Sequence, residues 1–456
     1  MKKHQKSGKT QPEYFFIEAL GCPKNLVEAE VVSGSMISAG YGISFDPDQA
    51  DIYIICTCGF LPSARGEAAD SIANAVEWKA GKKHRTVVVA GCLLNHSDID
   101  KFREHFSDVD IWVPVNDTAR IPDLLNGQAA VGDAGGITFL ADENNVRMQF
   151  TLPHVAYLKI SDGCNNRCAY CTIPSLRGEL RSRSIAGIVS EAKQLVANGV
   201  KELIVIAQDL TAFGQDKPER KENAAGLLKA LDAIEGNFVI RLLYTHPAHY
   251  TDEFIDVVAN AVHILPYLDM PLQHISDRIL AAMNRHIDRA GIENLLAKLR
   301  ERIPDLTLRT TFITGLPGET EEEFEELCEF VRKWKFERFG VFSFAPEPGT
   351  PAAGMADQIP VEVADARAKK LLKSQKERMK RNQKKLIGTQ IRAIFDYVDE
   401  ESGYGVARGV ADAPDIDNVI YFEPDETIEP GDFITLEISG CAGSDLVGTA
   451  VPAINI

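Results

Sequence analysis

The sequence predicts an α/β protein with three parts: an N-terminal open parallel α/β sheet, a central partial (β/α) barrel and a small antiparallel β-barrel at the C-terminal end. Short apolar runs alternate with helix-compatible stretches as far as Phe344. After Gly388, short strands are separated by Gly, Pro, Asp and Asn. The 456 residues also exceed one ordinary domain of ~150 residues, so we expect several domains.

The predicted N-terminal domain, residues 12–136, has three strands that each end in a cysteine. The segments YFFIEALGC, DIYIICTC and TVVVAGC end at Cys22, Cys58 and Cys92. Ligands of open parallel sheets collect outside the carboxyl ends of the strands. Buried free cysteine is a common packing residue, but three at equivalent positions favour a shared metal site. Cys56 precedes Cys58 by two residues on the same side of its strand, so it is a competing ligand. We expect Cys58 to be the ligand, because it stands at the strand end beside Gly59, where backbone can approach a cluster.

The predicted central domain, residues 150–386, repeats the βα pattern six times, as in a parallel barrel whose site lies at the carboxyl ends of its strands. The strands are VAYLKIS, ELIVIAQD, FVIRLLYTH, YLDMPLQH, LTLRTTFITG and FGVFSFAP. Residues 361–386 then read as one long basic helix, a connector or alternatively an arm for phosphate contact. Residues 387–455 form the predicted small β-barrel.

The stretch DGCNNRCAYCTIPSLRG follows the first central strand and places Cys164, Cys168 and Cys171 within eight residues. A zinc site needs a fourth ligand, and ordinary electron-transfer clusters use four cysteines. Three thiolates on a four-iron cluster leave one iron open to a ligand that is not protein. The spacing therefore favours an iron–sulfur cluster that binds a cofactor or substrate.

This spacing resembles the radical S-adenosylmethionine (SAM) signature CxxxCxΦC, with Tyr170 as the aromatic residue. The resemblance implies that Cys164, Cys168 and Cys171 hold a 4Fe-4S cluster whose open iron binds SAM. Reduction then cleaves SAM to methionine and a 5′-deoxyadenosyl radical. In such barrels, residues at the strand ends contact SAM, and we expect Tyr170, Gln208, Gln273 and Arg309 to do so here.

The three cysteines Cys22, Cys58 and Cys92, the SAM signature and the C-terminal barrel of TRAM type together resemble the methylthiotransferases. That resemblance implies a second 4Fe-4S cluster on the N-terminal cysteines, which delivers sulfur, and the use of two SAM molecules. The segments GCPKN and IPSLRGEL resemble the ribosomal-protein branch, RimO, which modifies the β-carbon of an aspartate in small-subunit ribosomal protein twelve. The alternatives are a tRNA adenosine methylthiotransferase, whose first motif usually reads GCQMN, and a non-catalytic iron–sulfur electron carrier.

The charge distribution favours a protein substrate. Residues 387–456 contain two basic and fourteen acidic residues, so this part alone carries −12 of the net charge of −17. An acidic barrel repels the phosphate backbone and attracts a basic ribosomal protein, and direct nucleic-acid binding is not expected. The N-terminus MKKHQKSGKTQPEY has no apolar segment behind it, so we expect a cytoplasmic enzyme without membrane attachment. Because the cleavage of SAM needs reduction, we also expect an electron donor as a partner.

Overall fold

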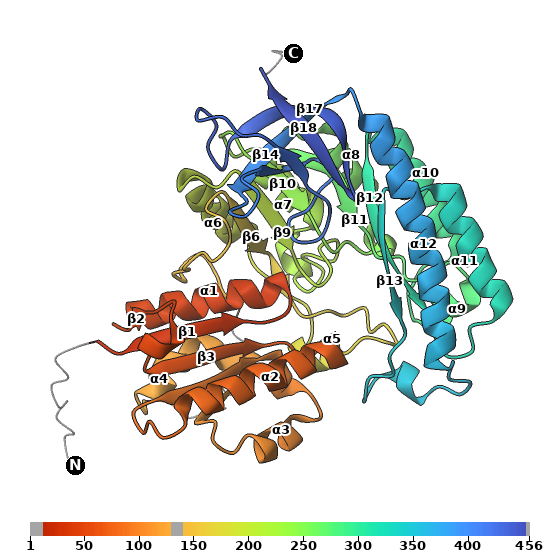
Figure 1. Ribbon diagram of the computed structural model, residues 1–456. Coiled ribbons are helices and arrows are strands. Elements are labelled where there is room, and N and C mark those ends of the chain that lie inside the picture. Colours follow the sequence, from red (N-terminus) through yellow and green to blue (C-terminus); the bar gives the residue numbers. More distant parts are fainter. Residues whose placement is uncertain (1–11, 129–139, 453–456) are drawn as a thin grey trace. The chain divides into compact units, whose positions relative to one another are not determined.

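The computed structural model describes residues 12–128 and 140–452 (Figure 1). The chain divides into two compact units. Unit 1 contains the described residues up to Phe150 together with Thr172–Glu179, and unit 2 contains Thr151–Cys171 and the chain from Leu180 onwards. Parts of the predicted features lie outside the described residues: most of the basic N-terminal segment, residues 129–136 of the first predicted domain and residues 453–455 of the last. The predicted domain bounds stay predictions.

Unit 1 is built on a five-stranded, entirely parallel sheet, which confirms the predicted open α/β sheet. The strand order is β2-β1-β3-β4-β5. All six residues of β3, IYIICT, are buried, as expected for a central strand covered on both faces. The strands are β1 (Tyr14–Ala19), β2 (Gly42–Ile43), β3 (Ile52–Thr57), β4 (Thr86–Gly91) and β5 (Ile111–Pro114).

Helices cover both faces of this sheet and produce two apolar cores. Ile54 and Val88 pack on one face with Met36 of α1, whereas Ile55 packs on the other face with Ile72 of α2. This division follows from the period-2 alternation of side chains along each strand. The helices are α1 (Pro23–Ser38), α2 (Pro62–Lys79), α3 (Ile99–His105), α4 (Ile121–Leu125) and α5 (Ile173–Arg177), with a short 3₁₀ helix, η2 (Cys92–Asn95).

Unit 2 contains a six-stranded parallel sheet whose strands are neighbours in chain order, as in a partial (β/α) barrel. Its strands are β6 (Val155–Lys159), β9 (Glu202–Ile206), β10 (Val239–Leu242), β11 (Ile264–Asp269), β12 (Thr307–Thr314) and β13 (Arg338–Ser343). A small two-stranded antiparallel sheet is formed by β7 (Ser161–Asp162) and β8 (Arg181–Ser182). Figure 1 shows the helices outside the parallel sheet. They are α6 (Ile185–Ala197), α7 (Ala224–Asp232), α8 (Asp252–Asn260), α9 (Asp277–Ala282), α10 (Arg289–Arg302) and α11 (Glu321–Trp334).

The long basic helix α12 (Val361–Leu386) packs along unit 2 and is not a free arm. Leu371 lies in the main core, Arg367 forms an ion pair with Glu319 at 2.9 Å, and Arg378 donates to the carbonyl of Val331. Its other face carries exposed lysines. In the described parts of the chain, no helix combines the length and apolar character needed to cross a membrane.

The C-terminal part closes into a five-stranded barrel of order β14-β15-β16-β18-β17. One pair, β16 with β18, is parallel, whereas the other pairs are antiparallel. Phe395, Phe422 and Leu436 fill the interior. The strands are β14 (Gln390–Val398), β15 (Gly405–Gly409), β16 (Ile420–Phe422), β17 (Phe433–Ala442) and β18 (Asp445–Val451).

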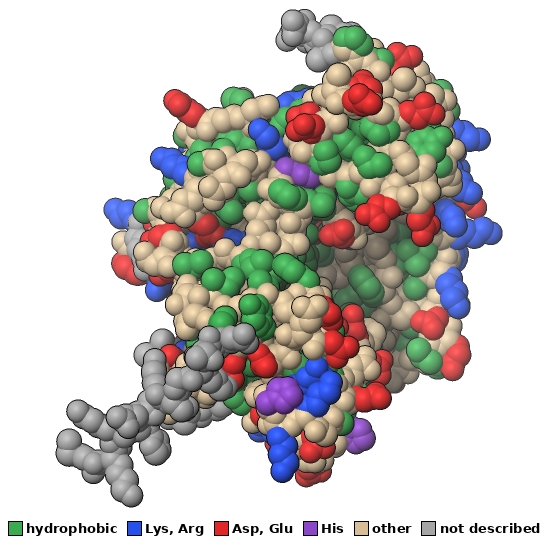
Figure 2. Space-filling view, turned by 60° about the vertical axis from the view of Figure 1, so that its left-hand side comes forward, with side chains coloured by type: hydrophobic (Ala, Val, Ile, Leu, Met, Phe, Trp, Pro, Cys, Tyr) green, Lys and Arg blue, Asp and Glu red, His purple; other side chains and the backbone are tan. Residues whose placement is uncertain are grey.

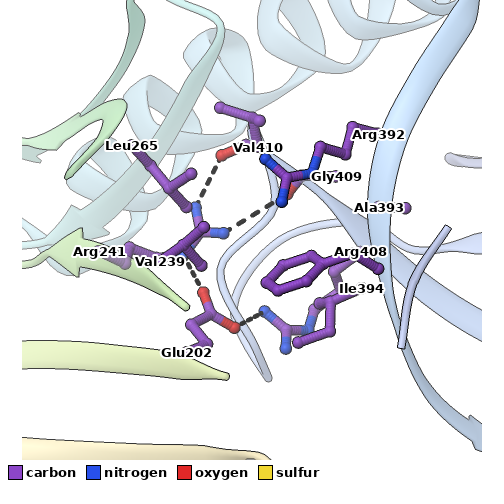
Figure 3. Close-up of a pocket in the computed structure, with 11 residues that line it drawn as sticks. Glu202, Val239, Arg241, Leu265, Arg392, Ala393, Ile394, Arg408, Gly409 and Val410 are labelled. Carbon is purple, nitrogen blue, oxygen red and sulfur yellow. Dashed lines mark hydrogen bonds and ion pairs between the residues drawn. The ribbon is translucent and has the colours of Figure 1, made fainter. Parts of the chain in front are cut away.

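A buried ion network joins this barrel to the parallel sheet within unit 2 (Figure 3). Glu202 of β9 bonds to Arg241 at 2.6 Å and to Arg408 of the barrel at 2.6 Å. Arg241 also donates to the carbonyl of Val410 at 2.8 Å. Burial opposes ionisation of Glu202, but the two guanidinium groups hold its pKa below the ordinary value. The barrel is thus attached through paired charges.

Removing the charge of Glu202 is expected to destabilise unit 2. Glu202→Gln leaves Arg241 and Arg408 buried without this carboxylate, and breaking a buried ion pair costs about 3–5 kcal/mol. The denaturant midpoint of unfolding, followed by circular dichroism, measures this loss. The matched control is Glu253→Gln, because Glu253 pairs with Lys229 on the surface and its removal should change the midpoint little. Equal midpoints for both variants would contradict the prediction.

The barrel keeps an acidic surface although several of its acids are used internally. Asp396 pairs with Arg408, and Asp412 pairs with Arg338. Figure 2 shows acidic side chains near the top of the molecule, around the barrel. Nine exposed acids belong to this part: Glu400, Glu401, Asp415, Glu423, Asp425, Glu426, Glu429, Asp432 and Glu437.

Candidate functional site

The signature cysteines of unit 2 lie on a tight loop directly after β7. Gly163 has φ +73°, which glycine adopts readily, and Arg167 has φ +49°. The amide of Cys171 donates to the carbonyl of Cys168 at 3.0 Å. Burial, followed by the nearby Asp209 and Cys168, raises the pKa of Cys164 to about 11. The loop thus places Cys168 in a buried position and Cys164 and Cys171 in partly buried ones.

A second loop, residues 283–286 after α9, supports the cysteine loop. The amide of Ala169 donates to the carbonyl of Met283, and Asn284 Nδ2 donates to the carbonyls of Asn166 and Arg167. Arg285, which is 3% exposed, places Nη1 3.5 Å from Cys168 Sγ and 3.5 Å from the hydroxyl of Tyr170. A buried guanidinium therefore faces a predicted cluster ligand.

The charge of Arg285 should raise the reduction potential of a cluster on this loop, because hydrogen bonds to cluster sulfurs favour the reduced state. We expect Arg285→Met to shift the midpoint potential to more negative values and to slow SAM cleavage. Potentiometric titration followed by electron paramagnetic resonance measures the shift.

The control for this measurement is Arg278→Met. Arg278 is half-exposed and pairs with Glu323, so its loss should leave the midpoint potential unchanged. The expectation fails if Arg285→Met and the parent protein titrate at the same potential.

Asp209, just beyond the end of β9, connects the cysteine loop to two histidines. Asn166 Nδ2 donates to its Oδ2 at 2.7 Å, and His249 Nδ1 lies 2.8 Å from the same atom. Burial opposes ionisation, but hydrogen bonds, first from His249, lower the pKa of Asp209 to about 2. The carboxylate is therefore an acceptor, and His249 Nδ1 donates to it.

The group Asp209, His246 and His249 has ligand atoms within 4.8 Å of one another, a spacing that could suit a metal ion. However, Asp209 Oδ1 also accepts from Thr211 Oγ1 at 2.6 Å and from the amide of Ala212. Both carboxylate oxygens are thus already engaged by two donors each. We interpret the group as a hydrogen-bonded support for the cysteine loop.

Three of the four predicted SAM contacts lie beside the cysteine loop or at the strand ends. Tyr170 faces Arg285. Gln208 Nε2 donates at 2.8 Å to Asp162, which stands two residues before Cys164. Gln273 has φ +71° and bridges to Phe312 on β12. The buried Oε1 atoms of Gln208 and Gln273 have no hydrogen-bond partner among the described residues. SAM carries ammonium, amino and hydroxyl donors, so these acceptors fit it.

The fourth predicted contact, Arg309, is engaged elsewhere. It is the third residue of β12, pairs with Asp269 at 2.8 Å and lies 3.8 Å from Asp417 of the C-terminal barrel. The structure therefore does not bring Arg309 together with Tyr170, Gln208 and Gln273. Its role as a SAM contact stays a prediction.

The three N-terminal cysteines follow the ends of β1, β3 and β4 in unit 1, where neighbouring parallel strands deliver them. A Cβ on Gly21 would lie 2.5 Å from Cys58 Cβ, so the segment before Cys22 touches Cys58. Gly91, with φ +108°, turns the chain into η2, which begins at Cys92. Burial is the main cause that raises the pKa of both Cys58 and Cys92.

Cys56 occupies a different environment from these three. It lies within β3 and packs in the core with Ile54 and Val88. Burial raises the pKa of Cys56, and the negative charge of Glu28 raises it further. This placement favours Cys58 over Cys56 as a ligand, because Cys58 lies beyond the strand end.

Comparison with known proteins assigns each part of the chain to a family. Residues 158–331 match the Radical SAM superfamily, residues 387–451 match the TRAM domain, and residues 14–114 match an uncharacterized protein family, UPF0004. The chain is similar in fold to TsrM, a radical SAM methyltransferase from Kitasatospora setae, with a TM-score of 0.56, 14% identity and 75% of each chain covered. The cobalamin-dependent enzyme OxsB gives 0.51 at 12% identity, covering 75% of this chain and 55% of its own.

Two curated relatives are ribosomal protein uS12 methylthiotransferases named RimO. The protein from Anaeromyxobacter sp. (strain Fw109-5) is 40% identical over 438 residues, which cover 96% of this chain and 93% of the relative. The protein from Geobacter sulfurreducens is 40% identical over 438 residues, covering 95% and 97%.

The superfamily match and the cysteine loop define this chain as a radical SAM enzyme. Its cofactors are SAM and a 4Fe-4S iron–sulfur cluster. Its near-complete alignment with the curated relatives narrows the assignment. The chain belongs to the RimO family of methylthiotransferases, and it is a transferase.

Sequence reasoning did not identify the residues that support the signature cysteines. It also missed the hydrogen bond of 2.7 Å from Arg177 to Asn25, although these two residues stand inside the motifs IPSLRGEL and GCPKN. Arg285 follows Asn284 in the segment MNRHIDR, where no periodicity marks it. Asp209 ends the predicted strand ELIVIAQD, so its place at a strand end was predicted although its hydrogen bonds were not. His249 lies seven residues beyond the end of β10, where no strand end marks it.

Proposed function

We propose that this enzyme replaces a hydrogen on the β-carbon of an aspartate in ribosomal protein uS12 with a methylthio group. It uses two 4Fe-4S clusters and two SAM molecules, one for the methyl group and one for hydrogen abstraction. The observation that carries the proposal is that two separate sets of three cysteines stand on one chain that aligns with RimO relatives over 95% of its length. Each set is one thiolate short of closing a four-iron cluster.

Each residue set has a distinct task in this proposal. Cys164, Cys168 and Cys171 would hold the cluster that supplies the electron for SAM cleavage, and Cys22, Cys58 and Cys92 would hold the cluster that supplies sulfur. Gln208, Gln273 and Tyr170 would orient SAM, and Arg285 would balance the charge at Cys168. An external electron donor completes the cycle.

The acidic barrel would recruit the substrate. Its nine exposed acids face solvent, and ribosomal proteins are basic, so long-range attraction favours encounter. The same surface disfavours a phosphate backbone, which supports a protein substrate over tRNA.

The test is anaerobic reconstitution followed by incubation with SAM, a reductant and either uS12 or unmodified tRNA. Mass spectrometry should find a methylthio gain on an aspartate of uS12, and a uS12 variant with Gly at that position, which has no β-carbon, should gain nothing. A methylthio group found on tRNA adenosine alone would overturn the proposal.

Docking on the barrel is tested separately with the triple variant Glu423→Gln, Glu426→Gln, Glu429→Gln. It should raise the KM for uS12, most clearly at low salt, while leaving kcat unchanged. The matched control carries Glu104→Gln, Glu301→Gln and Glu329→Gln, three exposed acids outside the barrel. Equal KM values for the two triple variants would exclude the barrel as the docking surface.

A further inference from the structure

We propose that Asn25 and Arg177 form a clamp that positions the three N-terminal cysteines for binding an iron–sulfur cluster. The inference rests on the proposed function, because it takes Cys22, Cys58 and Cys92 as ligands. All the contacts that carry it lie within unit 1.

Asn25 contacts each of the three segments that bear a cysteine. Its Nδ2 donates to the carbonyl of Leu20 at 2.9 Å and to the carbonyl of Thr57 at 2.8 Å. Leu20 lies two residues before Cys22, and Thr57 directly precedes Cys58. Its Oδ1 lies 3.6 Å from Cys92 Sγ. One amide, 1% exposed, therefore ties the ends of three strands together.

Arg177 fixes the orientation of that amide. Its Nη2 donates to Asn25 Oδ1 at 2.7 Å, and its Nη1 donates to Glu28 Oε1 at 2.6 Å. Because a guanidinium can only donate, Asn25 must turn its oxygen toward Arg177 and its NH₂ group toward the two carbonyls. The planar fork bridges Asn25 and Glu28, which lysine could not do with the same geometry.

Arg177 also supplies positive charge beside the cysteines. It is 3% exposed, and Cys58 and Cys92 are also buried, so thiolates that bind a cluster there need a nearby cation. Arg177 Nη2 donates to Asn25 Oδ1, the same oxygen that lies 3.6 Å from Cys92 Sγ. The clamp thus combines geometry from Asn25 with charge from Arg177.

Removing a group that holds metal ligands in place typically lowers the metal affinity about 10–100-fold. We therefore expect Asn25→Leu, which keeps the approximate volume and removes every polar contact, to weaken cluster binding about 10–100-fold. Arg177→Lys keeps the charge but loses the fork, so it should alter the electron paramagnetic resonance spectrum of the reduced cluster and weaken binding less.

The experiment uses the full chain with Cys164→Ala, Cys168→Ala and Cys171→Ala, so that only the N-terminal cysteines can hold a cluster. Iron and sulfide per chain are measured after anaerobic reconstitution and again during a titration with a chelator, and the spectrum of the reduced cluster is recorded. Asn126→Leu is the matched control, because Asn126 donates to the carbonyl of Pro122 in unit 1 away from the three cysteines.

The outcomes separate the clamp from the proposed function. If the triple-alanine parent with Asn25 and Arg177 intact takes up no iron, the N-terminal cysteines are not ligands and the proposed function fails. If the parent binds a cluster and both Asn25→Leu and Arg177→Lys match it in iron retention and spectrum, the clamp is overturned. Circular dichroism checks folding, and if Asn25→Leu does not fold, the spectrum of Arg177→Lys decides.

Discussion

Replacing Cys168 with alanine is expected to abolish the cleavage of SAM to 5′-deoxyadenosine. The change leaves two thiolates on the signature loop, too few to hold a four-iron cluster, and it also removes the sulfur that faces Arg285. The product is measured by mass spectrometry after anaerobic incubation with SAM and dithionite. We expect it to fall to the level of protein without iron.

The control for this experiment is Cys328→Ala. Cys328 packs in the core of unit 2 on α11, and alanine there removes only a small apolar contact. This variant should cleave SAM like the parent. Formation of 5′-deoxyadenosine by the Cys168→Ala variant at the parent rate would show that the signature loop is not the cluster site.

Replacing Cys92 with alanine should separate the two halves of the reaction. The variant keeps the signature loop in unit 2, so we expect it to retain SAM cleavage, but it should form no methylthio product on uS12. Iron content should fall by the share of one cluster. Both quantities come from one anaerobic reaction, with 5′-deoxyadenosine and modified uS12 measured in the same sample.

Cys56→Ala is the matched control, because Cys56 lies in the same sheet but packs in the core of unit 1. It should retain methylthio transfer, whereas Cys58→Ala should lose it. If Cys56→Ala loses transfer and Cys58→Ala keeps it, the ligand in this strand is Cys56. Retained transfer by Cys92→Ala would remove the N-terminal cysteines from the mechanism.

The sequence predicted those features that depend on local pattern. The buried run IYIICT and the repeated βα units predicted both parallel sheets, and the spacing of Cys164, Cys168 and Cys171 predicted one loop. The closed barrel was also predicted from its short strands, although its parallel pair was not, since pairing direction depends on contacts distant in sequence.

The supporting contacts were not predicted because they join residues far apart in the chain. Arg177 lies 149 residues from Glu28, and Arg285 lies 117 residues from Cys168. Arg309 shows the same limit, since it precedes the glycine segment at the end of its strand in the sequence but pairs with Asp269, 40 residues away. A pattern of residue types locates a strand end, but the partner of a side chain depends on the folded arrangement.

The path of the chain between the two units limits how this enzyme can be divided. Thr172–Glu179 belongs to unit 1, although the chain on both sides of it belongs to unit 2. A fragment that ends at Phe150 would contain Cys22, Cys58 and Cys92 but would lack Arg177. The N-terminal part is therefore not a module that gene fusion or truncation could transfer intact, because its three cysteines keep Arg177 beside them only when the chain continues through the signature loop.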